Sequence, residues 1–296
     1  MTFVQKKPRR WGDRRDGVWV RDLPGMNAVM GVLFPKRTQS EVFMQQEIDI
    51  TELLKFLEEK NGPDAPYKTT LFHCIVTIMA RVLNERPKMN RFVQGARTYE
   101  RDEITLGFTM KRKFTDHSEE SLMILKAQAQ DTLASISRRI VGDVKEVRER
   151  DTTAGIDNVL DVFGKMPRLL LMFIVRIVRW LDFWGKVPKA LTEGDTNYAS
   201  VMLSNLGSIK CPSVYHHLND YGTTSVFIII GTMHKAQKVM PDGSIEIRDV
   251  VDIGATIDER IADGFYFARS LKLVNHICSH PELLDRPLEE SGYEYK

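Results

Sequence analysis

The stretch Asp258-Glu259-Arg260-Ile261-Ala262-Asp263-Gly264 decides how this sequence is interpreted. It joins two segments of different periodicity. Residues 244–257 are predicted to form a strand that follows the turn at residues 241–243, and residues 264–279 a helix that ends at residues 280–281. Residues 258–263 form the short connection between these two elements.

Length and composition limit the class of protein. The chain has 296 residues, enough for one large domain with a hydrophobic core. Its formal net charge of +2 argues against a dedicated nucleic-acid-binding protein, which carries a marked basic excess. Cys74, Cys211 and Cys278 are too widely spaced for a disulfide framework or a zinc site, so they indicate a reducing, cytoplasmic location. The N-terminus lacks the apolar core of a signal peptide.

The remaining sequence predicts strands and helices in a mixed order. A capping box of Asp49 and Glu52 is expected to open one helix. Alternating apolar residues in 104–110 predict a strand that pairs with 98–100 as a hairpin, and 117–150 has the period of a helix. Further strands are expected at 42–48, 198–203, 225–231 and 235–240, and further helices at 50–59, 70–84 and 166–186.

Five stretches in order carry a resemblance to a known family. They are residues 46–54 (QEIDITELL), 85–92 (ERPKMNRF), 203–207 (LSNLG), 258–264 (DERIADG) and 281–284 (PELL). Together they resemble the catalytic domain of the dihydrolipoyl acyltransferases of 2-oxoacid dehydrogenase complexes, whose fold is that of chloramphenicol acetyltransferase. The resemblance spans roughly residues 25–285. The family motif is His-x-x-x-Asp-Gly, and here Glu259 stands where the histidine is expected.

The resemblance implies a domain organisation. The fold would be an α/β two-layer sandwich, a mixed sheet covered by helices. Residues 25–290 would form the acyltransferase-like domain, including a helical segment at 117–190, without a lipoyl domain before it. Residues 1–24 are predicted to be a solvated basic arm that packs on a neighbouring subunit or stays mobile, and residues 291–296 a tail.

The resemblance also implies a chemistry. Glu259 would take the place of the base that removes a proton from the thiol of coenzyme A or of dihydrolipoamide. Ser204 would donate a hydrogen bond to the oxyanion of the tetrahedral intermediate. Asp263 would hold the loop through an arginine, with Arg260, Gly264 and Asn205 as structural residues of the site. The expected substrate is an acyl-CoA or another thioester, no metal is expected, and the active sites would lie between the subunits of a homotrimer.

The substitution leaves the base open to several interpretations. A glutamate has an ordinary pKa near 4.3, about four units below that of a thiol, and burial can close much of that gap. His216 and His217, nine residues past Gly207, are alternative bases or merely a surface pair. His73 is expected to be a core histidine, and Cys211 a buried cysteine rather than a nucleophile. His234, His276 and His280 have no evident partners in the sequence.

The helix predicted at 166–186 departs most from the family. Arg168, Arg179, Asp182 and Lys186 share one narrow stripe, and the remaining surface is apolar. The helix could be a core or trimer-interface element, line a pocket for a long acyl chain, or lie on a membrane surface. Two functions follow from the whole sequence: a CoA-linked acyltransferase, or a catalytically inactive structural or ligand-sensing trimer.

Overall fold

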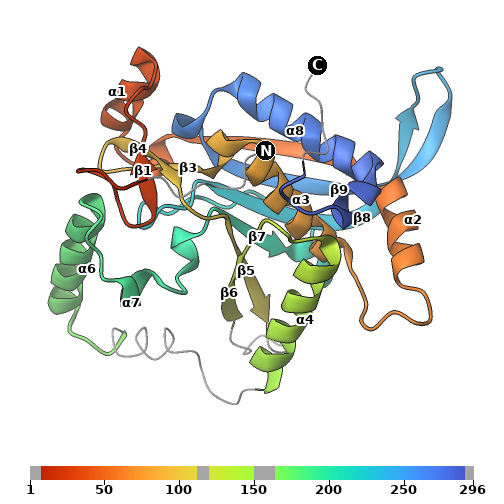
Figure 1. Cartoon of the computed structure of the whole chain (residues 1–296), viewed down its shortest axis with the longest axis horizontal. Helices are drawn as coiled ribbons and strands as arrows, with labels where there is room; N and C mark the ends of the chain where they lie inside the picture. The colour runs from red at the N-terminus through yellow and green to blue at the C-terminus, as the bar shows by residue number, and fades with distance from the viewer. Residues whose placement is uncertain (1–7, 112–119, 150–163, 291–296) are drawn as a thin grey trace.

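A six-stranded mixed sheet is the framework of the molecule. The computed structural model describes residues 8–111, 120–149 and 164–290 (Figure 1). The strand order is β2-β9-β8-β7-β5-β6, with β7 parallel to β5 and β8 and the other pairs antiparallel. The strands are β2 (Glu41–Asp49), β5 (Thr105–Lys111), β6 (Glu120–Lys126), β7 (Val201–Asn205), β8 (Val226–Val239) and β9 (Ile245–Asp258).

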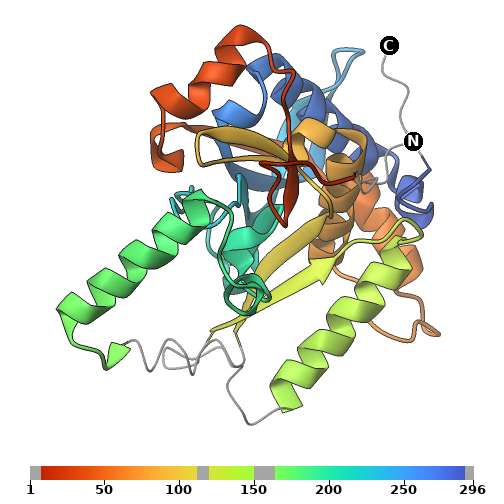
Figure 2. The same cartoon turned by 60° about the vertical axis from the view of Figure 1, so that its left-hand side comes forward.

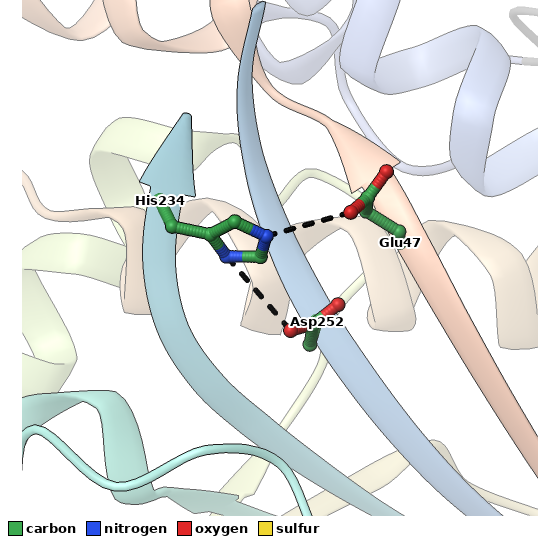
Figure 3. Close-up of side chains that lie close together, drawn as sticks. All are labelled: Glu47, His234 and Asp252. Atoms are coloured by element: carbon green, nitrogen blue, oxygen red, sulfur yellow. Dashed lines mark ion pairs between the residues drawn. The ribbon is translucent and has the colours of Figure 1, made fainter. Parts of the chain in front are cut away.

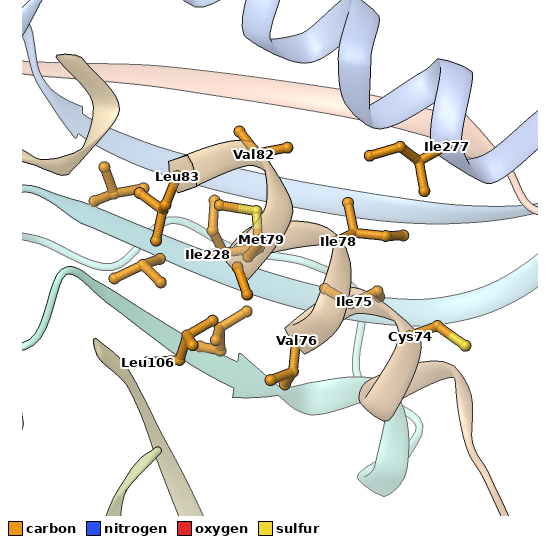
Figure 4. Close-up of a cluster of buried hydrophobic side chains, with 14 of the residues drawn as sticks. Cys74, Ile75, Val76, Ile78, Met79, Val82, Leu83, Leu106, Ile228 and Ile277 are labelled. Carbon is orange, nitrogen blue, oxygen red and sulfur yellow. The ribbon is translucent and has the colours of Figure 1, made fainter. Parts of the chain in front are cut away.

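Helices cover one face of this sheet, as the sequence predicts for an α/β sandwich. The apolar side chains of the central helix lie between the sheet, where Leu106 of β5 and Ile228 of β8 are found, and the last long helix, which contributes Ile277 (Figure 4). The central helix is buried on most sides because its residues are almost all apolar. The helices are α1 (Gly25–Leu33), α2 (Thr51–Lys60), α3 (Leu71–Glu85), α4 (Leu133–Glu149), α6 (Arg168–Phe183), α7 (Lys189–Thr192) and α8 (Gly264–Ser279).

His73 lies inside α3, and its imidazole is a satisfied core group as predicted. It is buried, and its Nδ1 accepts a hydrogen bond of 3.3 Å from the backbone N–H of Thr70. Burial lowers the pKa of His73 to about 4. We therefore expect the neutral His73 to contribute its full stabilisation above pH 6.5. The free energy of unfolding should fall by roughly 3 kcal/mol as the pH drops toward 4, because only the unfolded chain takes up the proton in that window.

Urea unfolding of the chain between pH 4 and 8 measures this effect. The matched control is His73→Gln, which keeps a side-chain acceptor for Thr70 but cannot titrate. The difference in unfolding free energy between the two proteins should change with pH only below about 6.5. A difference that stays constant down to pH 4 would show that His73 is protonated as readily in the fold as outside it.

A second, three-stranded sheet corrects two expectations. β4 (Arg97–Arg101) pairs with β3 (Arg91–Gln94) and with β1 (Gly17–Trp19), not with β5, so the predicted hairpin of 98–100 with 104–110 is wrong. The described part of the basic arm is only partly solvated, because β1 belongs to this sheet while residues 8–11 are exposed. The guanidinium of Arg14 is buried over the ring of Phe92, 5.5 Å from its centroid.

Three smaller differences concern element boundaries. Residues 120–126 form strand β6 before α4 begins, so the predicted helical region is only partly helical. The two strands expected at 225–240 are one strand, β8, with an irregularity between Ile230 and Met233. The predicted capping box is also absent: Ile50 is the N-cap of α2, and the carboxylate of Asp49 accepts from the N–H of Thr51.

The loop of residues 211–219 crosses the face of the sheet opposite α3 and α8, which we call the outer face. Gly231 and Gly254 allow this crossing, because a Cβ on either would lie 2.4 Å or less from backbone atoms of Ser213 or Val214. The ring of Tyr215 packs on Phe43 of the edge strand, with centroids 5.3 Å apart. The loop thereby fixes which side chains remain accessible on the outer face.

Helix α6 lies within the predicted range 166–186 and is shorter at both ends, and the orientation of its faces is unexpected. Asp182 is its one fully buried residue, whereas Leu169, Phe173 and Trp180 are exposed. Figure 2 shows α6 at the edge of the molecule, away from the sheet. The helix is therefore not part of this chain's own core. Among the described residues, no helix is long and apolar enough to cross a membrane.

Candidate active site

Glu259 lies at the exposed tip of the turn that follows β9. It opens a short 3-10 helix, Glu259–Ile261, and its backbone N–H donates to the carbonyl of Ser40 with an N···O distance of 2.9 Å. Its carboxylate is exposed within the single chain. The burial that makes a carboxylate a stronger base would therefore have to come from another molecule.

A buried ion-pair network beneath Glu259 holds the turn. Both carboxylate oxygens of Asp258 accept from the guanidinium of Arg260, at 2.8 and 2.7 Å, and Nε of Arg37 lies 3.6 Å from the same carboxylate. Arg260 also donates to the carbonyl of Phe34. All three charged side chains are buried. The sequence analysis missed Arg37, because no local pattern connects it with a turn more than two hundred residues away.

Asp263 has a different structural role from the one expected. Its carboxylate accepts a 2.8 Å hydrogen bond from the N–H of Tyr266 and so caps α8. The arginine that fixes the turn is paired with Asp258, so the expected pairing of Asp263 with Arg260 is wrong. Gly264 begins the helix, and a Cβ added there would meet no atom within 4 Å. Within one chain the geometry does not require glycine at this position.

Ser204 is near the carboxyl end of β7, on the outer face of the sheet. Its neighbour Leu203 points into the core, so the alternation of side chains turns Ser204 the other way. Asn205 caps the following 3-10 helix by accepting from the N–H of Ser208. The backbone of Gly207 packs so closely on the carbonyl of Gly231 that there is no room for a Cβ. Within the described residues the Ser204 hydroxyl has no hydrogen-bond partner, and it is half-buried. It is therefore available to a ligand.

Ser204 and Glu259 do not meet within one chain. Ser204 pairs with Ile229 of β8, which pairs with Gly254 of β9, whereas Glu259 lies five residues further along. At about 3.3 Å per residue and about 4.8 Å between strands, the two side chains are separated by on the order of 15 Å or more. The structure therefore does not bring the two predicted catalytic residues together in a monomer.

His216 is closer to Ser204 than Glu259 is. Its ring stacks on Phe227 with centroids 4.3 Å apart, and Phe227 is a diagonal neighbour of Ser204 on the outer face. The His216 Nδ1 lies 2.7 Å from the carbonyl of His217, and the two imidazoles are stacked. Both histidines are exposed. His216 thus remains the geometric alternative as a base, while Cys211 is half-buried and not in a disulfide.

His234 has charged partners that the sequence did not reveal. Its Nε2 lies 3.4 Å from a carboxylate oxygen of Glu47 and its Nδ1 lies 3.8 Å from one of Asp252, across three adjacent strands (Figure 3). The carboxylates face opposite nitrogens of one ring, and Lys238 also pairs with Glu47. One metal ion can bind only one of these nitrogens. The arrangement fits an imidazole that bridges two carboxylates better than a metal centre.

Two cavities lie elsewhere in the described chain. One of about 930 Å³ is lined by the N-terminal segment, β5, β6 and residues 185–199, with Arg9, Arg15 and Lys189 opposed by Asp102 and Glu193. Because both signs of charge line it, it is not a simple anion site. The other, of about 90 Å³, is apolar and lies between α3, α8 and the sheet. Neither of these two cavities is lined by α6, so neither supports the acyl-pocket interpretation of that helix.

Comparisons with known proteins agree with this fold. Residues 187–285 match the family model of the 2-oxoacid dehydrogenases acyltransferase (catalytic domain). Over 250 residues the chain is 22% identical to the lipoamide acyltransferase component of the branched-chain alpha-keto acid dehydrogenase complex of Bacillus subtilis. That alignment covers 82% of this chain and 48% of the relative, so the chain spans about half the length of that protein.

Solved structures extend the similarity to nearly the whole chain. The dihydrolipoamide acetyltransferase of Azotobacter vinelandii, studied for the role of a serine, a histidine and an asparagine in its mechanism, is 15% identical and superposes with a TM-score of 0.59 over 95% of this chain and 99% of that chain. A chloramphenicol acetyltransferase is 13% identical, with a TM-score of 0.54 over 86% and 94%. The chain therefore has the fold shared by the catalytic domains of 2-oxoacid dehydrogenase acyltransferases and by chloramphenicol acetyltransferase, and its residues 187–285 are similar to the former family.

Proposed function

We propose that this protein is a CoA-linked acyltransferase whose active site combines Ser204 of one subunit with Glu259 of another. The observation that carries the proposal is the free, half-buried hydroxyl of Ser204, held on the outer face by the capped turn that follows it. The buried pair of Asp258 and Arg260 presents Glu259 at the surface, where a neighbouring subunit could cover it. Coenzyme A enters this site as a substrate.

The reaction follows from the groups available. A base, Glu259 or His216, takes the proton of the acceptor thiol, and the resulting thiolate attacks the carbonyl carbon of the acyl thioester. The Ser204 hydroxyl donates a hydrogen bond to the oxygen that becomes negative in the tetrahedral intermediate. Collapse of the intermediate breaks the original carbon–sulfur bond, and the protonated base returns its proton to the departing thiolate. The acyl group has then moved from one thiol to the other.

The proposed assembly is a homotrimer with active sites between subunits. The separation of Ser204 from Glu259 within one chain supports this, since a shared site needs a second subunit. The uncharged helix α1 exposes Met26, Val29, Val32 and Leu33, an apolar face suited to contact with another copy. The three unpaired cysteines are compatible with a cytoplasmic location, which we retain as part of the proposal.

Acyl transfer from a panel of acyl-CoA thioesters tests the function, with the released thiol followed by a colour reagent. Ser204→Ala should lower kcat by about 10²- to 10³-fold, because one oxyanion donor is removed. Ser208→Ala is the matched control: this serine is exposed in the same turn and should leave kcat within about twofold. Activity that survives unchanged in Ser204→Ala would remove the serine from the mechanism.

A second candidate function is a catalytically inactive trimer that binds a ligand without turning it over. The observation that favours it is the single change at Glu259 in an otherwise retained motif. Calorimetry with coenzyme A separates the alternatives when no turnover is found. Binding without turnover indicates a sensor, and absence of binding indicates a structural role.

A further inference from the structure

Helix α6 exposes a continuous apolar ridge. Leu169, Phe173, Ile177 and Trp180 recur at intervals of three or four residues, so they lie along one side of the helix, and Trp184 directly after the helix continues the row. All five are exposed, Leu169 by 81% and Trp180 by 60%. A soluble monomer rarely presents a row of large apolar side chains without a function for it.

The charge of α6 is one-sided as well. Arg168, Arg176 and Arg179 are exposed and project within one arc of the helix, next to the apolar ridge. The single acidic residue of the helix, Asp182, is buried and paired with Arg14, 3.2 Å away. The solvent-facing part of α6 therefore carries positive charge and no negative charge.

We propose that α6 binds the surface of a membrane that contains anionic lipids. A helix of 16 residues is about 24 Å long, shorter than the hydrocarbon core of a bilayer of about 30 Å. It would lie in the interface, with the apolar ridge among the acyl chains and the arginines beside headgroup phosphates. Tryptophan at this depth and arginine at the rim are the residue types that such a position favours.

The charge distribution favours a membrane over a second copy as the partner of α6. The exposed apolar face of α1 has no charged residue, so it can pack on another protein surface without an acidic counterpart. Anionic groups next to an apolar phase would stabilise the arginines beside the α6 ridge. An anionic bilayer offers both, because its charged headgroups lie beside its acyl chains. The body of the protein contacts α6 chiefly through buried Asp182, so the outer side of the helix is free to approach a flat surface (Figure 2).

Co-sedimentation of the full chain with vesicles tests the proposal. The chain should bind vesicles of phosphatidylcholine mixed with phosphatidylglycerol, bind phosphatidylcholine alone at least tenfold more weakly, and show a blue shift of tryptophan emission on binding. Arg176→Gln with Arg179→Gln should weaken binding to the anionic vesicles by roughly 30-fold. Phe173→Ser with Trp180→Ser should weaken it by more than roughly 100-fold.

The matched control is Val239→Ser with Ile245→Ser, which removes exposed apolar surface from the paired ends of β8 and β9 and should leave vesicle binding unchanged. Circular dichroism checks that each variant is folded, and sedimentation velocity without lipid measures the oligomeric state. The proposal is overturned if the native chain does not bind anionic vesicles, or if the α6 variants bind as well as the native chain. It is also overturned if the α6 variants alter the oligomeric state, because α6 would then be an interface between copies.

Discussion

Replacing Glu259 with histidine should raise the rate of acyl transfer at pH 7.5 by about a hundredfold or more. An imidazole has an ordinary pKa near 6.5, much closer to that of a thiol than a carboxylate is, and a well-matched general base contributes about 10²- to 10⁴-fold. The turn can accept the change, because the side chain at this position is exposed and the turn is held by Asp258 and Arg260 rather than by Glu259. Initial rates with the best acyl-CoA substrate measure the effect.

Two further variants identify the base in the native chain. Glu259→Gln removes the carboxylate with little change in shape, and His216→Ala removes the nearest imidazole on the outer face. If Glu259 is the base, Glu259→Gln loses the activity and His216→Ala keeps it; if His216 is the base, the losses are reversed. A Glu259→His variant that is folded, binds coenzyme A and yet is no faster than the native chain would contradict the proposed position of the base.

The C-terminal third of the fold could be predicted closely from the sequence. The turn at residues 241–243 separates β8 from β9, and Asp263 ends the connection to α8 by capping it, so the predicted helix 264–279 matches the structure at both ends. These signals are local, because a turn or a cap depends on residues a few positions apart. β8 was predicted as two strands because its irregularity near Gly231 resembles a break in the sequence.

Contacts between distant segments could not be predicted in the same way. The alternation in β4 and β5 is that of two strands, but only the tertiary structure pairs β4 with β1 and β5 with β7. For α6, the polar stripe suggests a solvated side, yet its Asp182 faces inward toward Arg14. One long-range ion pair, between positions 168 residues apart, therefore buries one member of a stripe whose other residues are exposed.

The sequence predicts which residues belong to the candidate site, but it does not predict how they are arranged in space. The motif frame identifies Ser204 and Glu259, and the resemblance implies a site between subunits. The register of three strands is what separates the two residues in one chain, and no sequence pattern contains that register. The network of Arg37 with Asp258 was not foreseen for the same reason, since it joins the start of β2 to the end of β9.

Asp182→Ala is expected to lower the free energy of unfolding by about 3–5 kcal/mol. The carboxylate accepts from Nη2 of Arg14, Nε2 of Gln94 and the hydroxyl of Tyr198, at 3.2, 2.7 and 3.0 Å. Removing it leaves the buried guanidinium of Arg14 without this counter-charge, which is the costly half of a buried ion pair. Urea unfolding followed by tryptophan emission, to which Trp180 and Trp184 at α6 contribute together with Trp11 and Trp19, measures the loss.

Two control variants distinguish the effect of losing the buried charge from the effect of losing hydrogen bonds and from the effect of losing another partner of Arg14. Asp16 also pairs with Arg14, at 2.9 Å, but it is partly exposed, so Asp16→Ala should cost less than about 1 kcal/mol. Asp182→Asn keeps an acceptor for Tyr198 and should cost less than Asp182→Ala.

Burial raises the pKa of Asp182, so the native chain binds this proton more readily than the unfolded chain. The free energy of unfolding therefore falls as the pH rises from the pKa of Asp182 in the unfolded chain to its pKa in the folded chain. The Asp182→Asn variant lacks that fall. If Asp182→Ala and Asp16→Ala prove equally mild, the attachment of α6 does not depend on the buried pair.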